Sequence, residues 1–170
     1  MINYNRKKEL LDRILNFTVP DNLDIGDWIL SYNVDDIAQQ ITVLDHMIFS
    51  NISVSELLNK NWTRPNKKEL SPNICILTSR FNNAAHWVAS IIVQCISTEK
   101  RIQLLGRLIE ISHALKDLGN HYGAMALYAG LTNSAVKRLG RTWDVSYFFL
   151  FIIFYYFYLF IYLFIYYNRN

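Results

Sequence analysis

Residues 99–118 read EKRIQLLGRLIEISHALKDL. Apolar side chains recur in this segment at steps of three and four, at Leu104, Leu108, Ile111, Leu115 and Leu118. Because an α-helix has about 3.6 residues per turn, these side chains form one stripe along a helix, and the charged residues between them fall outside it. The segment therefore predicts an amphipathic helix that is long enough to cross a small domain.

The segment from residue 34 to residue 48 has the same periodicity, carried by Val34, Ile37, Ile41, Leu44 and Ile48. Its start is also marked. Asn33 is a residue type that caps helices, and two aspartates follow in the first turn, where the positive end of the helix dipole favours carboxylates. We expect a helix over residues 34–48 with Asn33 as its cap.

Two further helices are predicted. Residues 83–96 are apolar on nearly all sides, which is typical of a buried, central helix. Gly119 and Asn120 interrupt the pattern after residue 118, because glycine commonly follows a helix end and asparagine can cap the next helix. That next helix is rich in small residues, which predicts close packing. Residues 59–73 are rich in Asn, Lys and Pro and predict a loop.

No segment before residue 145 alternates apolar and polar residues between turns, so the predicted fold class is all-α. The net charge is +3, and the basic residues are scattered among acidic ones. This pattern does not favour nucleic acid as a partner. Cys75 and Cys95 are the only two cysteines and form no CxxC motif, which is typical of reduced cysteines in a cytoplasmic protein. The charged N-terminus does not resemble a signal peptide, so we expect a cytoplasmic location.

The motifs of common enzyme sites are missing. The sequence has no GxxxxGK[ST] phosphate loop, no HExxH metal pair and no glycine-rich dinucleotide turn. The four histidines are not spaced by helical turns, so we expect no metal and no cofactor. From the residues alone, the prediction is a helical interaction module without a catalytic residue.

An ordered series of short motifs goes further. The series is Asp36–Asp45 (DIAQQITVLD), Glu56-Leu57-Leu58, Trp62, Ser71-Pro72-Asn73, Arg80-Phe81-Asn82 with Trp87, Arg101, Gly119–Gly123 (GNHYG), Lys137-Arg138-Leu139 and Thr142-Trp143. Each motif alone is weak, but their order and spacing over about 110 residues resemble the catalytic domain of the guanine-nucleotide exchange factors of Ras-family small GTPases (RasGEF). We therefore identify residues 34–144 as part of such a domain.

This resemblance implies an all-helical domain whose partner is a Ras-family small GTPase. It implies exchange without covalent chemistry, because the factor binds the nucleotide-free GTPase more tightly than the loaded one. In the family, the domain core holds the second switch region of the GTPase and a helical hairpin displaces the first.

Among the matching positions, Asn82 is the main candidate for a polar contact to the second switch region. Asn82 could instead cap a helix starting at residue 83, and the two roles are compatible. Arg80, Ser31 and Asn33 are further candidates for the same surface. Five residues are expected to have structural roles, in or beside the core, in capping or in pairing within the domain: Phe81, Trp87, Asn120, Arg138 and Trp143.

The resemblance ends abruptly after Trp143. The family's hairpin and closing helices should follow, and nothing after Val145 resembles them. We expect a fragment of low stability, in which exchange activity is lost or impaired. The division expected is an N-terminal flank (1–33), the partial domain (34–144), an apolar segment (145–167) and a polar end (168–170).

Residues 147–167 contain only Phe, Tyr, Ile and Leu. Three interpretations remain open. As a helix the segment is long enough to span a bilayer, which would make the chain a non-catalytic, membrane-anchored interaction module. Its aromatic and β-branched residues also suit an aggregation-prone β segment. Finally, such a composition can arise when AT-rich non-coding sequence is translated.

Overall fold

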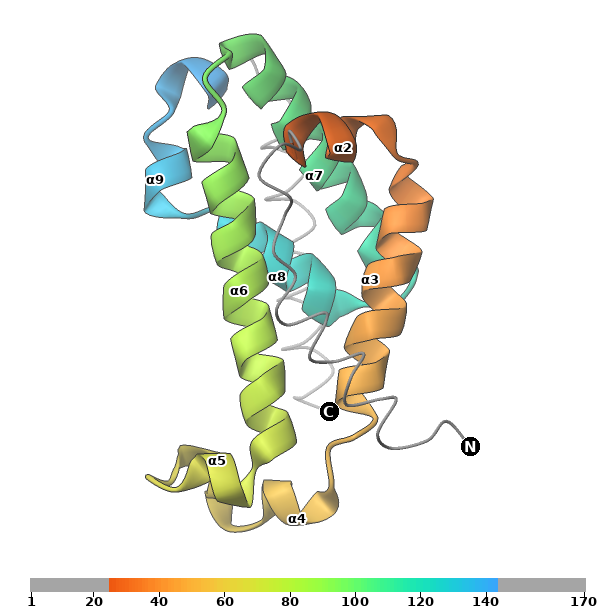
Figure 1. Ribbon diagram of the computed structural model, residues 1–170, viewed down its shortest axis with the longest axis vertical. Coiled ribbons are helices and arrows are strands. Elements are labelled where there is room, and N and C mark those ends of the chain that lie inside the picture. The colour runs from red at the N-terminus through yellow and green to blue at the C-terminus, as the bar shows by residue number, and fades with distance from the viewer. Residues whose placement is uncertain (1–24, 144–170) are drawn as a thin grey trace, which may run out of the picture.

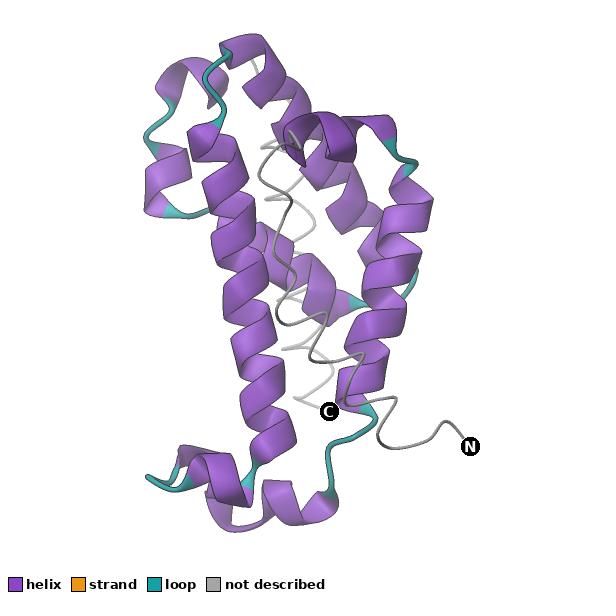
Figure 2. Cartoon of the chain, in the orientation of Figure 1, coloured by secondary structure: helices purple, strands orange, loops and turns teal. Residues whose placement is uncertain are grey.

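The computed structural model describes residues 25–143, and all regular structure in this range is helical (Figure 2). The elements are α2 (Ile25–Ser31), α3 (Val34–Phe49), α4 (Val54–Leu57), the 3₁₀ helix η1 (Leu58–Thr63), α5 (Lys67–Leu70), α6 (Pro72–Gln94), α7 (Thr98–Asp117), α8 (His121–Leu131) and α9 (Ser134–Lys137). The predicted all-α class is confirmed for the described residues.

Three long helices and α8 form the body of the fold. The two helices α3 and α6 run along opposite sides of the molecule, and α8 crosses between them (Figure 1). Helix α8 packs on both α6 and α7, and α7 also packs on α3. The short elements α4, η1 and α5 lie together at one end, where α3 ends and α6 begins (Figure 1).

The local signals predicted for the starts of α3 and α8 are confirmed. The Asn33 side chain accepts hydrogen bonds from the backbone N–H groups of Asp35, at 2.7 Å, and Asp36, at 3.4 Å. Gly119 has a φ of 77°, a conformation that glycine adopts without strain, and Asn120 caps α8 through the N–H of Gly123 at 2.8 Å. These caps fix where α3 and α8 begin.

The start of α6 differs from the prediction. The helix begins at Pro72, eleven positions before residue 83, so Asn82 lies within the helix and does not cap it. Residues 59–73, predicted as a loop, contain most of η1, all of α5 and the first two residues of α6. Proline is well suited to the first helical position, because its missing N–H would have no partner there.

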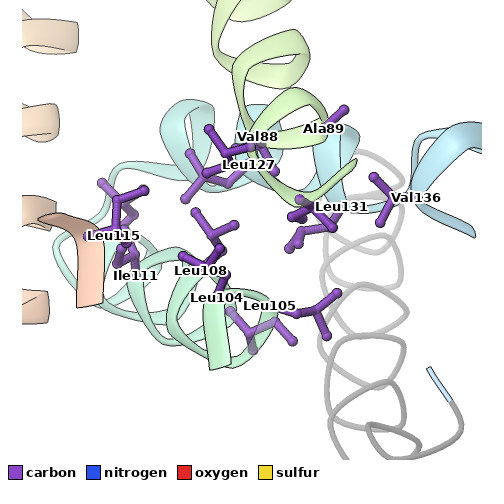
Figure 3. Close-up of a cluster of buried hydrophobic side chains, with 14 of the residues drawn as sticks. Val88, Ala89, Leu104, Leu105, Leu108, Ile111, Leu115, Leu127, Leu131 and Val136 are labelled. Atoms are coloured by element: carbon purple, nitrogen blue, oxygen red, sulfur yellow. The ribbon is translucent and has the colours of Figure 1, made fainter. Parts of the chain in front are cut away.

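The core lies where α6, α7 and α8 meet (Figure 3). Leu104, Leu108, Ile111 and Leu115 of α7, the predicted stripe, are buried. Leu127 and Leu131 of α8 and Val88 of α6 pack with them (Figure 3). Only Leu118 of the stripe is exposed, because it lies at the helix end.

The predicted close packing of α8 is confirmed at Gly130. A Cβ atom at this position would lie 2.6 Å from the backbone oxygen of Ala85 and 2.6 Å from the Cβ of Val88. Real side chains do not approach this closely, so the backbones of α6 and α8 can meet here only with glycine.

Ile29 of α2 is 1% exposed and belongs to the core, so residues before position 34 pack on the domain. No helix within residues 25–143 is long and apolar enough to cross a membrane. Residues 145–167 and 168–170 lie outside the described residues, as do residues 1–24. The three interpretations of the apolar segment therefore stay predictions.

Candidate functional site

Asn82 is exposed in the middle of α6. Most exposed positions along its side of the helix carry polar side chains and recur at helical spacing, and the exposed Val93 is the apolar exception. This surface, the α6 polar face, consists of Thr78, Ser79, Asn82, Asn83, His86, Ser90 and Gln94. The Asn82 amide makes no hydrogen bond within residues 25–143, unlike Thr78 and Ser90, whose hydroxyls donate to carbonyls of their own helix. Asn82 can therefore offer both donor and acceptor to a partner.

Arg80 points elsewhere, into a polar cluster that joins three helices. Its Nε donates to Asp45 Oδ1 of α3 at 3.3 Å, and Asn120 Nδ2, at the start of α8, donates to Asp45 Oδ2 at 2.8 Å. Asp45 is 6% exposed. This cluster, Asp45, Arg80 and Asn120, fastens α3, α6 and α8 to one another.

The electrostatics of the cluster follow from burial. Burial raises the pKa of Asp45, although hydrogen bonds from Asn120 and Arg80 and the charge of Arg80 act to lower it. Burial, together with the nearby charge of Asp45, raises the pKa of Tyr122 to about 12. The Tyr122 hydroxyl donates to the Leu77 carbonyl of α6. The neutral tyrosine thus adds a second link between α8 and α6.

The structure does not bring Arg80 together with Asn82 on one surface. Side chains two positions apart on a helix project about 200° apart, and Arg80 faces α3 while Asn82 faces outward. Ser31 and Asn33 lie at the junction of α2 and α3. Asn33 is twelve residues from Asp45, which is roughly 18 Å along α3, so it lies far from the guanidinium of Arg80.

Ser31 and Asn33 are both exposed, but their side chains have local partners. The Ser31 hydroxyl donates to the Trp28 carbonyl at 2.8 Å, and Asn33 caps α3. Arg107 of α7 donates to the Leu30 carbonyl at 3.2 Å, which ties the same junction to the core. The geometry gives both residues a structural use, and contact with a partner stays a prediction.

The residues predicted to be structural have structural contacts. Phe81 packs edge-on against Tyr122 with ring centroids 5.7 Å apart, and Trp87 packs against the core. Arg138 Nε donates to the Ser134 carbonyl within its own turn, at 3.2 Å. Trp143 is buried and donates from Nε1 to the Val136 carbonyl at 2.8 Å.

Sequence reasoning missed two buried carboxylates, Asp45 and Glu56. Asp45 lies one turn after Ile41 and one turn before Ile48, so its place on the apolar stripe was a signal of burial. Glu56 is 3% exposed and accepts hydrogen bonds from the backbone of Asn73 and Ile74, at 2.8 and 3.1 Å. Its position in the motif Glu-Leu-Leu gave no hint of this partner. Within residues 25–143, no group of three or more His, Cys, Asp and Glu side chains could hold a metal ion.

Comparison with known proteins identifies relatives. Residues 36–147 match the RasGEF domain family. The chain is 38% identical over 113 residues to Ras guanine nucleotide exchange factor A of Dictyostelium discoideum, covering 65% of this chain and 19% of that protein. It is 36% identical over 117 residues to exchange factor W of the same organism, covering 68% and 10%. Exchange factor I is 38% identical over 119 residues, covering 69% and 14%.

The aligned region is therefore less than a fifth of the length of these relatives. The family match covers more than half of the 170 residues and includes the helices α6, α7 and α8 that build the core, together with the Asp45 cluster. The chain belongs to the RasGEF domain family.

Proposed function

We propose that the chain acts in guanine-nucleotide exchange on a Ras-family small GTPase, by binding the GTPase through the α6 polar face. The RasGEF domain match and the similarity to proteins named as Ras guanine nucleotide exchange factors support this class of partner. The observation that carries the proposed surface is Asn82, whose exposed amide has no hydrogen-bond partner within residues 25–143.

The opposite side of α6 explains why Asn82 is suited to this role. Val88 and Ile92 are fully buried against the rest of the core, and Arg80 is held by Asp45. A polar group on a helix that is fixed on its other side loses little conformational freedom when it binds. In this proposal, Asn82 contacts the GTPase and Arg80 positions the helix.

The proposed mechanism has no covalent step. If the surface binds the nucleotide-free GTPase more tightly than the GDP-loaded form, thermodynamic linkage requires that binding lowers the affinity of the GTPase for GDP by the same factor. A ligand that binds both forms equally would shift nothing. The essential quantity is therefore the ratio of the two affinities.

The test measures that ratio for the full chain. Immobilised Ras-family GTPases, nucleotide-free or loaded with GDP, are titrated with the protein, and the release of fluorescent GDP is followed in parallel. We expect tighter binding to the nucleotide-free form of at least one family member. We expect the Asn82→Ala variant to bind that form roughly 5- to 30-fold more weakly, the loss that corresponds to one or two hydrogen bonds at an interface.

A matched control is Gln103→Ala, which removes an exposed amide from α7. It should leave both affinities unchanged. Equal binding of the parent and the Asn82→Ala variant would show that the α6 polar face is not the binding surface. Equal binding to the two nucleotide states of every GTPase would show that the chain does not act as an exchange factor.

The same assay tests the sequence-based expectation that exchange activity is lost or impaired, because it follows the rate of GDP release. A chain that binds the nucleotide-free GTPase through Asn82 but barely accelerates GDP release would have the binding surface without the displacement of the first switch region. Rapid GDP release by the 170-residue chain would contradict that expectation.

A further inference from the structure

The end of the molecule formed by α4, η1 and α5 is a compact, well-anchored unit (Figure 1). We call residues 49–70 the α4–α5 tip. Glu56 fixes it to α6 by accepting hydrogen bonds from the backbone and side chain of Asn73, at 2.8 and 2.7 Å. The buried Ser71 hydroxyl donates to the Glu56 carbonyl at 2.9 Å. The surface of the tip is therefore held in place by buried contacts beneath it.

Large apolar side chains are exposed on this tip to an unusual degree. The exposed fractions are 65% for Phe49, 75% for Val54, 54% for Leu57, 55% for Leu58 and 38% for Trp62. Single exposed apolar residues are common on soluble proteins and need no explanation. Here, five exposed apolar residues lie within fourteen consecutive positions. Such clusters mark surfaces that bind a membrane or another molecule.

The same tip carries a concentration of positive charge. Lys60, Arg64, Lys67 and Lys68 are all exposed. Residues 50–79 contain only two acids, and one of them, Glu56, has its carboxylate buried against α6. Glu69 is thus the only exposed acid among four exposed cations in that range. The tip is complementary to a negatively charged surface.

The backbone between the apolar residues has a rare conformation. Asn59 and Lys60 have φ values of 51° and 55°, which side-chain-bearing residues seldom adopt. Asn61 Nδ2 donates to the Ser55 carbonyl at 3.1 Å, which ties this turn back to α4. The exposed Lys60 therefore lies in a held turn, between the exposed Leu58 and Trp62 in the sequence.

We propose that the α4–α5 tip is a peripheral binding surface for membranes that contain anionic lipids. Leucine, phenylalanine and tryptophan side chains enter the headgroup boundary, and lysine and arginine side chains contact the anionic headgroups, as they do in proteins that lie on membranes. Lysine is depleted at protein interfaces, so three exposed lysines favour a lipid surface over an acidic protein.

This surface is separate from the α6 polar face, and none of its residues belongs to the segment 147–167. Asn82 lies ten residues along α6 from Pro72, which is roughly 15 Å from the start of the helix. The proposal does not depend on GTPase binding, so the two can fail independently.

The test is co-sedimentation of the full chain with phosphatidylcholine vesicles, with and without phosphatidylserine. We expect a higher partition coefficient when phosphatidylserine is present, and a loss of this increment at high salt, which screens exposed charges. The Lys67→Gln/Lys68→Gln variant should lower the partition on the anionic vesicles by about 30-fold, since each cation near such a surface contributes roughly fivefold. The Leu57→Ser/Leu58→Ser variant should lower it by roughly tenfold.

Each variant has a control of the same chemistry at the other end of α6. Lys137→Gln/Arg141→Gln removes two exposed cations, and Val93→Ser/Ile96→Ser removes two exposed apolar side chains. Neither should change the partition. The cation control lies nearer in sequence to residues 147–167, so it would respond most if that segment caused the attraction. Any affinity that this segment has for lipid is shared by all variants.

Three results would overturn the proposal. The first is equal partition of the parent protein on vesicles with and without phosphatidylserine. The second is an equal loss in the tip variants and their controls. The third is salt-sensitive binding to polyglutamate without binding to anionic vesicles, which would identify an acidic protein as the partner. The first of these results is measured on the parent protein alone, so the proposal can be overturned even if a substitution disturbs folding.

Discussion

Two carboxylates are buried in this domain, and their pKa values are shifted in opposite directions. Asp45 lies between α3, α6 and α8 and is held by two side chains, Arg80 and Asn120. Glu56 lies at the start of α6, where backbone N–H groups of Asn73 and Ile74 point at its carboxylate. Burial raises the pKa of Asp45. Burial also acts on Glu56, but the hydrogen bonds from Asn73, Ile74 and Ser53 outweigh it and lower the pKa of Glu56.

The difference shows what each site does for the fold. The N-terminus of a helix has unpaired N–H groups and the positive end of the helix dipole, so it favours an ionised carboxylate. Glu56 supplies α6 with a cap from 17 and 18 residues before the N–H groups that it accepts from. The Asp45 cluster instead joins three helices, and its contacts offset only part of the cost of burying the charge, because the pKa of Asp45 stays raised.

The largest effect is expected from Asp45→Ala. The substitution leaves Arg80, whose side chain is 20% exposed, without its ion-pair partner, and it leaves the buried Asn120 Nδ2 with only the 3.4 Å hydrogen bond to Thr42 Oγ1. Breaking a buried ion pair typically lowers the free energy of unfolding by 3–5 kcal/mol, and the partial exposure of Arg80 places this case near about 3 kcal/mol. Urea denaturation followed by circular dichroism measures the loss. The exposed Asp36→Ala on the same helix should cost less than about 1 kcal/mol, and a loss that small for Asp45→Ala would mean that the cluster does not hold the helices together.

A smaller loss is expected from Glu56→Ala. The substitution leaves the N–H groups of Asn73 and Ile74 without the acceptor on which α6 begins, which should lower the free energy of unfolding by about 2 kcal/mol. Hydrogen exchange should increase in the first turn of α6 before it does in α7. Glu69→Ala, an exposed acid at the same end, should stay within about 0.5 kcal/mol of the parent. Unchanged exchange at Asn73 would refute the capping role.

The smallest effect concerns the dependence of stability on pH. The Glu56 contribution is present above the ordinary pKa of glutamate and is lost as pH falls through its lowered pKa in the folded state. For Asp45 the folded-state pKa lies above the ordinary value of 3.8, so stability is lost as pH rises through this window. Glu56→Gln should therefore reduce the loss of stability at acid pH. Asp45→Asn should remove the loss of stability that occurs as pH rises through the pKa of Asp45. Urea midpoints across the acid range measure both, and identical slopes in the two variants would contradict the assigned directions.

The sequence was informative wherever structure depends on neighbouring residues. The stripe of residues 99–118 and the Asn33 cap predicted α7 and α3 to within one or two residues, because periodicity and capping act within a few positions. The start of α6 was missed because its cap, Glu56, is distant in sequence and Asn82 was an equally good local cap.

The residues of the candidate site were also predicted only in part. Asn82, predicted from the family resemblance, is exposed on α6. Arg80 was expected on the same surface, but tertiary packing directs it to Asp45, which lies 35 residues earlier. Such a pairing depends on how α3 and α6 approach each other, and the sequence of neither helix specifies it.

Gly130 has a consequence for the orientation of the proposed contact. It lets the backbone of α8 meet that of α6 beside Ala85, less than one turn from Asn82. The distance between α6 and α8 therefore sets how far Asn82 lies from the centre of the domain. A single added methyl group would clash with Ala85 and Val88, so α6 would have to shift. The geometry of the proposed contact at Asn82 thus depends on a glycine that is buried in the helix interface.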